Sequence, residues 1–231
     1  MLPGLEASLY VTRIHEPNNQ GTTHHSPRRT PGKKAGDSPV RNFFFTHMDS
    51  HVHTPVVEKS SLDWPDKHHF DATTGWLMLG NPREARVEFE QISSAARRTV
   101  DVLDVEWRLL ADEKRWEEAV AVADNQVSMA PQHVAGWIHR SFALHELRRT
   151  ESARDLLLPA VKLFAKETTI PYNLACYECQ LGNLNAARDW LRRTLSRHKS
   201  ADGRREQLAM ALTDPDLQPL ADGISRGEFD T

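Results

Sequence analysis

Apolar side chains recur every three to four residues along most of the chain from about Asp66 onward. This spacing places them on one face of a helix, and residues 83–89 and 115–120 are typical amphipathic helix starts. Alanine, leucine, glutamate and arginine, which favour helices, are dense in the same region. No apolar–polar alternation there is long enough to form a strand. The pattern therefore predicts an all-α fold.

The segment 1–60 has a different character. It contains six prolines and six histidines, and no helical or strand period persists in it. Such a segment buries too little apolar surface to offset the entropy of ordering it, so residues 1–60 are predicted to form a disordered tail. Met48 lies shortly before the helical region, and an alternative interpretation is that translation begins there.

An internal repeat is visible within the helical region. An alanine that follows a polar turn recurs at a constant spacing, at Ala85, Ala119, Ala153 and Ala187. A spacing of about 34 residues is the period of a helix–turn–helix repeat. The fullest copy lies at 172–191, where YNLACY leads to LGNL, a pair of alanines and a leucine. Gly182 in this copy and Gly80 in the first follow predicted helices, where glycine adopts a left-handed conformation most easily.

With this period and these residues, the chain resembles the tetratricopeptide repeat (TPR) family over about residues 66–199. The resemblance implies a right-handed α-solenoid of about four TPR helix–turn–helix units within an array at 61–213. The units would span about 66–99, 100–133, 134–167 and 168–201, followed by a capping helix at 203–213. Residues 214–231 would form a C-terminal tail, frayed from Gly223 onward. The Asp-Pro-Asp-Leu sequence at 214–217 resembles the tail after many bacterial TPR arrays, which indicates a bacterial protein.

Two features depart from the family pattern. Trp107 stands where the family prefers a small residue, while the facing position has only Ala123 in place of a large one. We expect this exchange to conserve core volume, which packed interiors tolerate. Pro159 lies inside a predicted helix of the third unit, where it removes one backbone hydrogen bond and predicts a kink.

Composition and charge narrow the setting of the protein. The 231 residues carry a net charge of −3, which shows no bias toward nucleic acid or an anionic membrane. No apolar run approaches the roughly 18 residues that a membrane span requires. Two cysteines exclude a disulfide framework and fit a reducing compartment. The sequence predicts a cytoplasmic protein without nucleic-acid or membrane partners.

The candidate catalytic and metal-binding motifs are weak. His51 and His53 resemble the His-x-His pair of metal-dependent amidohydrolases, but a helical repeat array has no barrel strands to supply the other ligands. Cys176 and Cys179 share one helix face without a second cysteine pair, which favours inert lining residues over a redox or zinc site. No Gly-rich phosphate loop or Gly-x-Ser-x-Gly turn is present. We expect a protein that is not an enzyme and that has no cofactor or metal. A metal-dependent hydrolase built on His51 and His53 is an alternative function, ranked below the two that follow.

The resemblance also implies where a partner binds, because the first helix of each TPR unit lines a concave groove. The lining residues, as this set is called below, are Phe70, Thr74, Leu77, Met78, Asp104, Arg108, Asp112, Ile138, Phe142, His145, Glu146, Tyr172, Cys176 and Cys179. Exposed apolar side chains on one wall need a cover, and a peptide or helix of another protein is the expected one. The rings of Phe142 and Tyr172 are then partly exposed in the free protein. The alternative is that some lining residues pack under the N-terminal tail or the C-terminal cap.

Two function classes follow from such a groove. The leading one is a protein-interaction scaffold or adaptor, and the alternative is a client-specific chaperone like the small TPR chaperones of bacterial secretion. Chaperone-docking members of the family hold a partner's terminal carboxylate with lysine and asparagine. The matching positions here are Phe70, Thr74, Val105, Ala135 and His139. They offer no such clamp, so capture of a Glu-Glu-Val-Asp type of peptide is disfavoured.

Overall fold

The computed structural model of the protein describes residues 62–229. Every regular element in this range is helical, so the predicted all-α class is confirmed for the described part of the chain. The α-helices are α2 (Asp66–Met78), α3 (Pro82–Phe89), α4 (Val100–Asp112), α5 (Trp116–Met129), α6 (Val134–Glu146), α7 (Thr150–Leu157), α8 (Ala160–Leu163), α9 (Thr169–Gln180), α10 (Leu184–Ser196), α11 (Ala201–Thr213) and α12 (Ala221–Ser225). Two 3-10 helices are η2 (Ala96–Arg98) and η3 (Pro215–Leu220). The predicted tail at 1–60 and the alternative start at Met48 lie outside the described residues.

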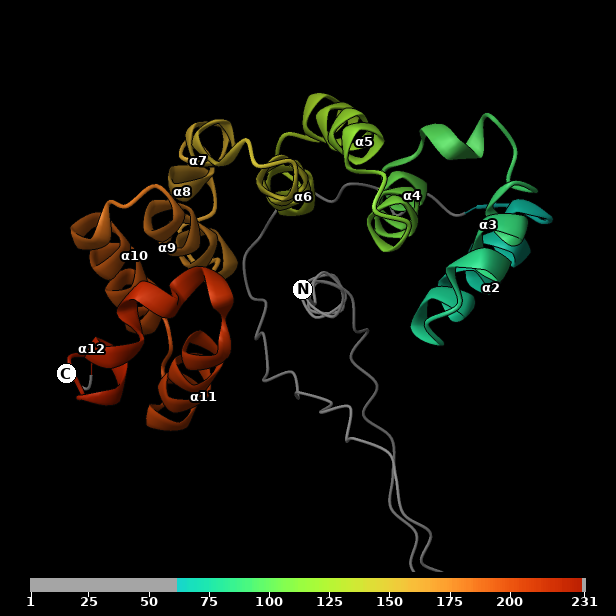
Figure 1. Cartoon of the computed structure of the whole chain (residues 1–231). Coiled ribbons are helices and arrows are strands. Elements are labelled where there is room, and N and C mark those ends of the chain that lie inside the picture. Colours follow the sequence, from blue (N-terminus) through green and yellow to red (C-terminus); the bar gives the residue numbers. More distant parts are fainter. Residues whose placement is uncertain (1–61, 230–231) are drawn as a thin grey trace, which may run out of the picture. The chain divides into compact units, whose positions relative to one another are not determined.

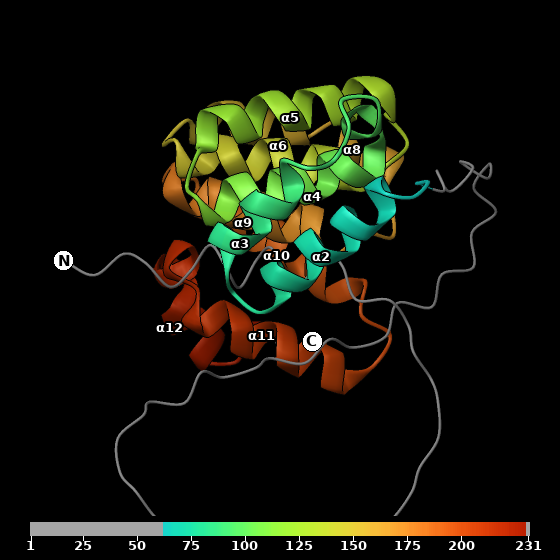
Figure 2. The same cartoon turned by 90° about the vertical axis from the view of Figure 1, so that its right-hand side faces the viewer.

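Helices that follow one another in the chain pack against one another. α2 pairs with α3, α4 with α5, and α9 with α10, while α6 packs against both α5 and α7. Figure 1 shows α4, α6 and α9 in succession in one layer and α5, α7 and α10 in the other. A quarter turn away, α5 and α6 run side by side (Figure 2). Most tertiary contacts of the described chain are therefore made between sequence neighbours.

The turn between paired helices has the same backbone geometry four times. Its left-handed residue is Gly80 (φ 68°), Lys114 (57°), Arg148 (61°) or Gly182 (80°). In each turn this residue donates its N–H to the carbonyl three residues before it, and the next residue donates to the carbonyl five residues before itself. This pair of bonds is the Schellman motif that ends many helices. The constant repeat spacing of the sequence thus recurs in the backbone.

The two middle turns place long side chains at positions that suit glycine. An L-residue in the left-handed region is strained by its Cβ, and both Lys114 and Arg148 are exposed. We expect Lys114→Gly and Arg148→Gly each to raise the free energy of unfolding by about 0.5–1 kcal/mol in urea titrations. Asn125→Gly, at an exposed position inside α5, is the matched control and should lower that free energy. Equal effects at all three positions would contradict the strained-turn interpretation.

Small residues mark the closest packing of the paired helices. Ala85, Ala119, Ala153 and Ala187, the four alanines of the repeat, are all fully buried. Trp107 and Ala123, the expected size exchange, are also buried. At Pro159, where the sequence predicts a kink, the helix is interrupted, since α7 ends at Leu157 and α8 begins at Ala160.

The chain beyond α11 is ordered and packed. Asp214 caps η3 by accepting a hydrogen bond from the backbone N–H of Asp216. Ile224 and Phe229 are buried, and Glu228 forms an ion pair with Arg192 at 3.0 Å. The expectation of fraying from Gly223 onward is therefore wrong over the described part of this tail, because its apolar side chains are packed against the helices.

Candidate functional site

The lining residues lie on the first helix of each predicted unit. They come from α2 (Phe70, Thr74, Leu77, Met78), α4 (Asp104, Arg108, Asp112), α6 (Ile138, Phe142, His145, Glu146) and α9 (Tyr172, Cys176, Cys179). Met78 and Glu146 are exposed, and Phe70, Thr74 and Asp112 are half-buried. The other nine are buried.

The aromatic lining residues do not have the exposure that the sequence analysis expected. Phe142 is 8% exposed, and its ring meets the rings of Trp107 and Trp116 edge to face, with centroids 6.2 and 5.9 Å away. Tyr172 is 2% exposed, and its hydroxyl donates to Asp214 Oδ2 at 2.7 Å. The expectation that both rings are partly exposed is wrong. Aromatic packing covers the first ring, and a hydrogen bond ties the second to the C-terminal chain.

A buried polar network joins α4, α5 and α6. Gln126 donates from Nε2 to Asp104 Oδ1 at 2.5 Å, and its Oε1 lies 3.0 Å from His139 Nδ1. The His139 ring stacks on Trp107 with centroids 4.0 Å apart. All four side chains are buried, so Asp104 is engaged in a network that positions three helices.

Arg108 is the buried lining residue with unused hydrogen-bonding capacity. Arg108 is 6% exposed, and its buried Nε has no hydrogen-bond partner among the described residues. Within residues 62–229, no carboxylate lies at ion-pair distance from its guanidinium, although Asp104 and Asp112 stand one turn away on the same helix. Burial lowers the pKa of Arg108 and raises the pKa of Asp112. The Nε of Arg108 is therefore a buried donor without an acceptor among residues 62–229.

At α9, the predicted lining is covered by residues 214–220, called the 214–220 segment below. Asp214 receives the Tyr172 hydroxyl, and Cys176 Sγ lies 3.7 Å from the same carboxylate oxygen. His145 Nε2 of α6 lies 3.0 Å from Asp216 Oδ2. Part of the lining at this end therefore packs under the chain's own C-terminal region, through residues that follow the predicted cap at 203–213.

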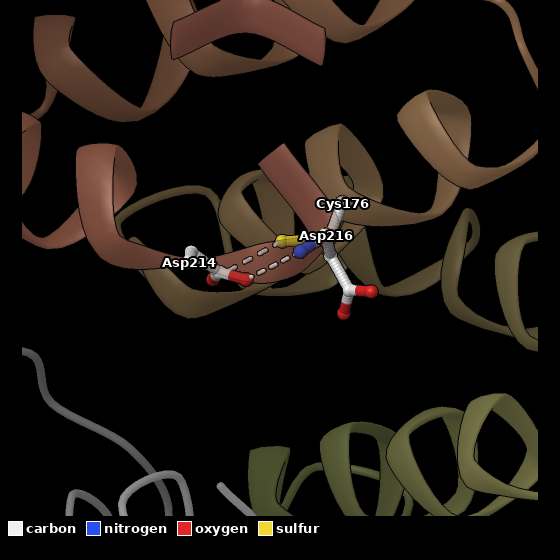
Figure 3. A group of neighbouring side chains, drawn as sticks. All are labelled: Cys176, Asp214 and Asp216. Atoms are coloured by element: carbon white, nitrogen blue, oxygen red, sulfur yellow. Dashed lines mark hydrogen bonds between the residues drawn. The ribbon is translucent and has the colours of Figure 1, made fainter. Parts of the chain in front are cut away.

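Cys176, Asp214 and Asp216 form a group with the donor types of a metal site. One ligand atom from each lies within 4.8 Å of the others. Figure 3 shows the Asp214 carboxylate bonded to both Cys176 Sγ and the Asp216 backbone nitrogen, while the Asp216 carboxyl group turns away. Since Asp214 also accepts from Tyr172, its oxygens are committed to holding the 214–220 segment on α9.

The other candidate motifs add no reactive group to this region. Cys176 and Cys179 are buried free thiols, and burial raises the pKa of Cys179 to about 11, which keeps it protonated. His51 and His53 lie outside the described residues. Burial also raises the pKa of Asp214, an effect that its hydrogen bond from Tyr172 partly opposes.

Sequence reasoning missed three of the residues that organise this region, namely Gln126, Asp214 and Asp216. The two aspartates had a signal in the Asp-Pro-Asp-Leu sequence, which was interpreted only as a tail resembling that of bacterial repeat arrays. Their partners lie far earlier in the chain, at Tyr172 and His145. Gln126 carried no distinguishing local signal.

No protein-family model matches this chain, and no curated protein matches it. Among the described residues, the helices are too short or too polar to cross a membrane.

Proposed function

We propose that the helical region is a right-handed α-solenoid of four TPR-like units with α11 as its cap. In this proposal the protein is a cytoplasmic, non-enzymatic scaffold that binds a peptide or helix of another protein along α2, α4, α6 and α9. Four Schellman turns and four fully buried alanines, both sets recurring with the same repeat spacing, support the repeat. Free buried cysteines fit the proposed compartment.

The observation that carries the binding role is the guanidinium of Arg108. A buried polar group is costly unless it is hydrogen-bonded, and arginine has five donors that match a carboxylate or a backbone carbonyl. A bound segment supplies such acceptors. The position one repeat before Arg108 is Thr74, and the exposed Met78 lies one turn beyond it. A segment on these helices would therefore meet one charged anchor and mixed apolar surface.

The test compares Arg108→Gln with wild type in capture of a partner from cell lysate, read by tandem mass spectrometry. A hydrogen bond to a charged group contributes about 1.5–3 kcal/mol, so partner affinity should fall roughly 10- to 100-fold. Wild-type capture should also weaken as salt rises. Arg83→Gln, on the exposed side of α3, is the matched control and should leave capture unchanged.

Thermal unfolding of both variants separates binding from folding. Loss of partner by Arg108→Gln with an unchanged midpoint supports the proposal. Capture equal to wild type by a folded Arg108→Gln protein would contradict it.

A further inference from the structure

The 214–220 segment contacts side chains of α9 and α6 that belong to the lining residues, the set that the sequence analysis expected to bind a partner. Tyr172 Oη and Cys176 Sγ meet the first carboxylate, Asp214. His145 Nε2 meets the second, Asp216, at 3.0 Å. Three lining residues are therefore occupied by one short stretch of the chain itself.

The contacts have the form of peptide recognition. Two carboxylates spaced two residues apart are each held by a different helix. Gln180 Nε2 donates to the backbone carbonyl of Asp216 at 3.2 Å, which fixes the main chain. Leu217 and Leu220 are 0% and 1% exposed, so the segment also buries two apolar side chains. Because charged, main-chain and apolar contacts are combined, this surface selects a segment by its sequence and not by its volume alone.

One of these contacts is costly to keep. Asp214 is a largely desolvated carboxylate whose burial raises its pKa, so holding its charge opposes part of the gain from its hydrogen bonds. His145 is tied on its other ring nitrogen to Thr150 Oγ1 at 3.0 Å, which orients the imidazole toward Asp216. The His145 ring is thus preorganised to contact Asp216, whereas the 214–220 segment bears the cost of desolvating the Asp214 carboxylate.

We propose that the 214–220 segment is an internal competitor for the C-terminal end of the binding surface. A partner segment that displaces it carries the same chemistry, namely two acidic side chains two residues apart followed directly by leucine. This inference rests on the proposed scaffold function and names the class of partner.

The probe is a fluorescent peptide with the sequence of residues 213–220, TDPDLQPL, titrated into the full-length chain with anisotropy as the readout. In Asp214→Asn/Asp216→Asn protein the internal segment is weakened, so the peptide should bind at least tenfold more tightly than to wild type. Adding Tyr172→Phe should reverse much of that gain. A peptide with asparagine at both acidic positions should bind weakly to every variant.

Asp202→Asn/Asp222→Asn is the matched control, since it removes two exposed carboxylates of the same region. It should bind the peptide as wild type does. If the Asp214→Asn/Asp216→Asn protein is folded by circular dichroism and binds no better than this control, the segment is a structural cap and the proposal is overturned.

A second measurement covers the case in which the double variant does not fold. Excess peptide added to wild type should speed hydrogen exchange at the backbone amides of Leu217, Gln218 and Leu220, and unchanged exchange at saturating peptide would overturn the proposal. Capture of the cellular partner through Arg108 is independent of both results. If the partner is captured but the peptide does not bind, the proposed scaffold function is retained and only the internal competitor is rejected.

Discussion

Phe142→Ala is expected to lower the free energy of unfolding by about 3–5 kcal/mol, the range for deleting a buried aromatic ring. The ring is 8% exposed and packs edge to face against two tryptophans, so its removal leaves a cavity between α4, α5 and α6. Denaturant unfolding followed by circular dichroism measures the loss. This loss would follow from the burial of a ring that the sequence analysis expected to be partly exposed.

Phe70→Ala is the matched control for that variant. Phe70 lies on α2 one turn before Thr74, the residue two repeat spacings before Phe142, and it is only half-buried. It should cost clearly less than Phe142→Ala. If Phe142→Ala lowered the free energy of unfolding by less than about 1 kcal/mol and abolished partner capture, Phe142 would be a binding residue and not a core residue.

Ala153→Leu and Ala187→Leu are each expected to lower the free energy of unfolding by about 1–3 kcal/mol. Both alanines are fully buried at the start of a second helix, just after a Schellman turn. The larger side chain forces apart helices that the small residue allows to approach. Thermal midpoints of the two variants, compared with wild type, test the prediction.

Ala121→Leu provides the comparison for these overpacking variants. Ala121 is exposed on α5, two residues beyond the equivalent buried position Ala119. Its substitution should change the midpoint little, because leucine is also a good helix former. Unchanged midpoints at Ala153 and Ala187 as well would mean that the repeat register is wrong.

Local features of the fold were predictable because their causes are local. The left-handed residues at Gly80 and Gly182 and the break at Pro159 each follow from a few adjacent residues. The left-handed conformations of Lys114 and Arg148 carried no residue-level signal. They correspond only to the repeat spacing, since Lys114 stands 34 residues after Gly80 and Arg148 stands 34 residues before Gly182, and both glycines are left-handed. There the tertiary repeat overrides local preference.

The candidate site was predicted less completely because burial depends on distant parts of the chain. The family resemblance assigned Tyr172 and His145 to the lining of a partner groove. It could not show that Asp214 and Asp216 return to contact these two side chains. The hydrogen-bonding state of Arg108 likewise depends on where the side chains of its neighbours turn, which spacing along one helix does not determine.

The two ends of the helical array differ in how they are supported. Within residues 62–229, α2 and α3 pack mainly against each other and α4, whereas α9 and α10 are also in contact with η3. When neighbouring repeats carry most of the contacts, loss of structure begins where fewest of them must break. Heat or mechanical tension should therefore open this part of the protein from the α2–α3 end, with the C-terminal helices the last to separate.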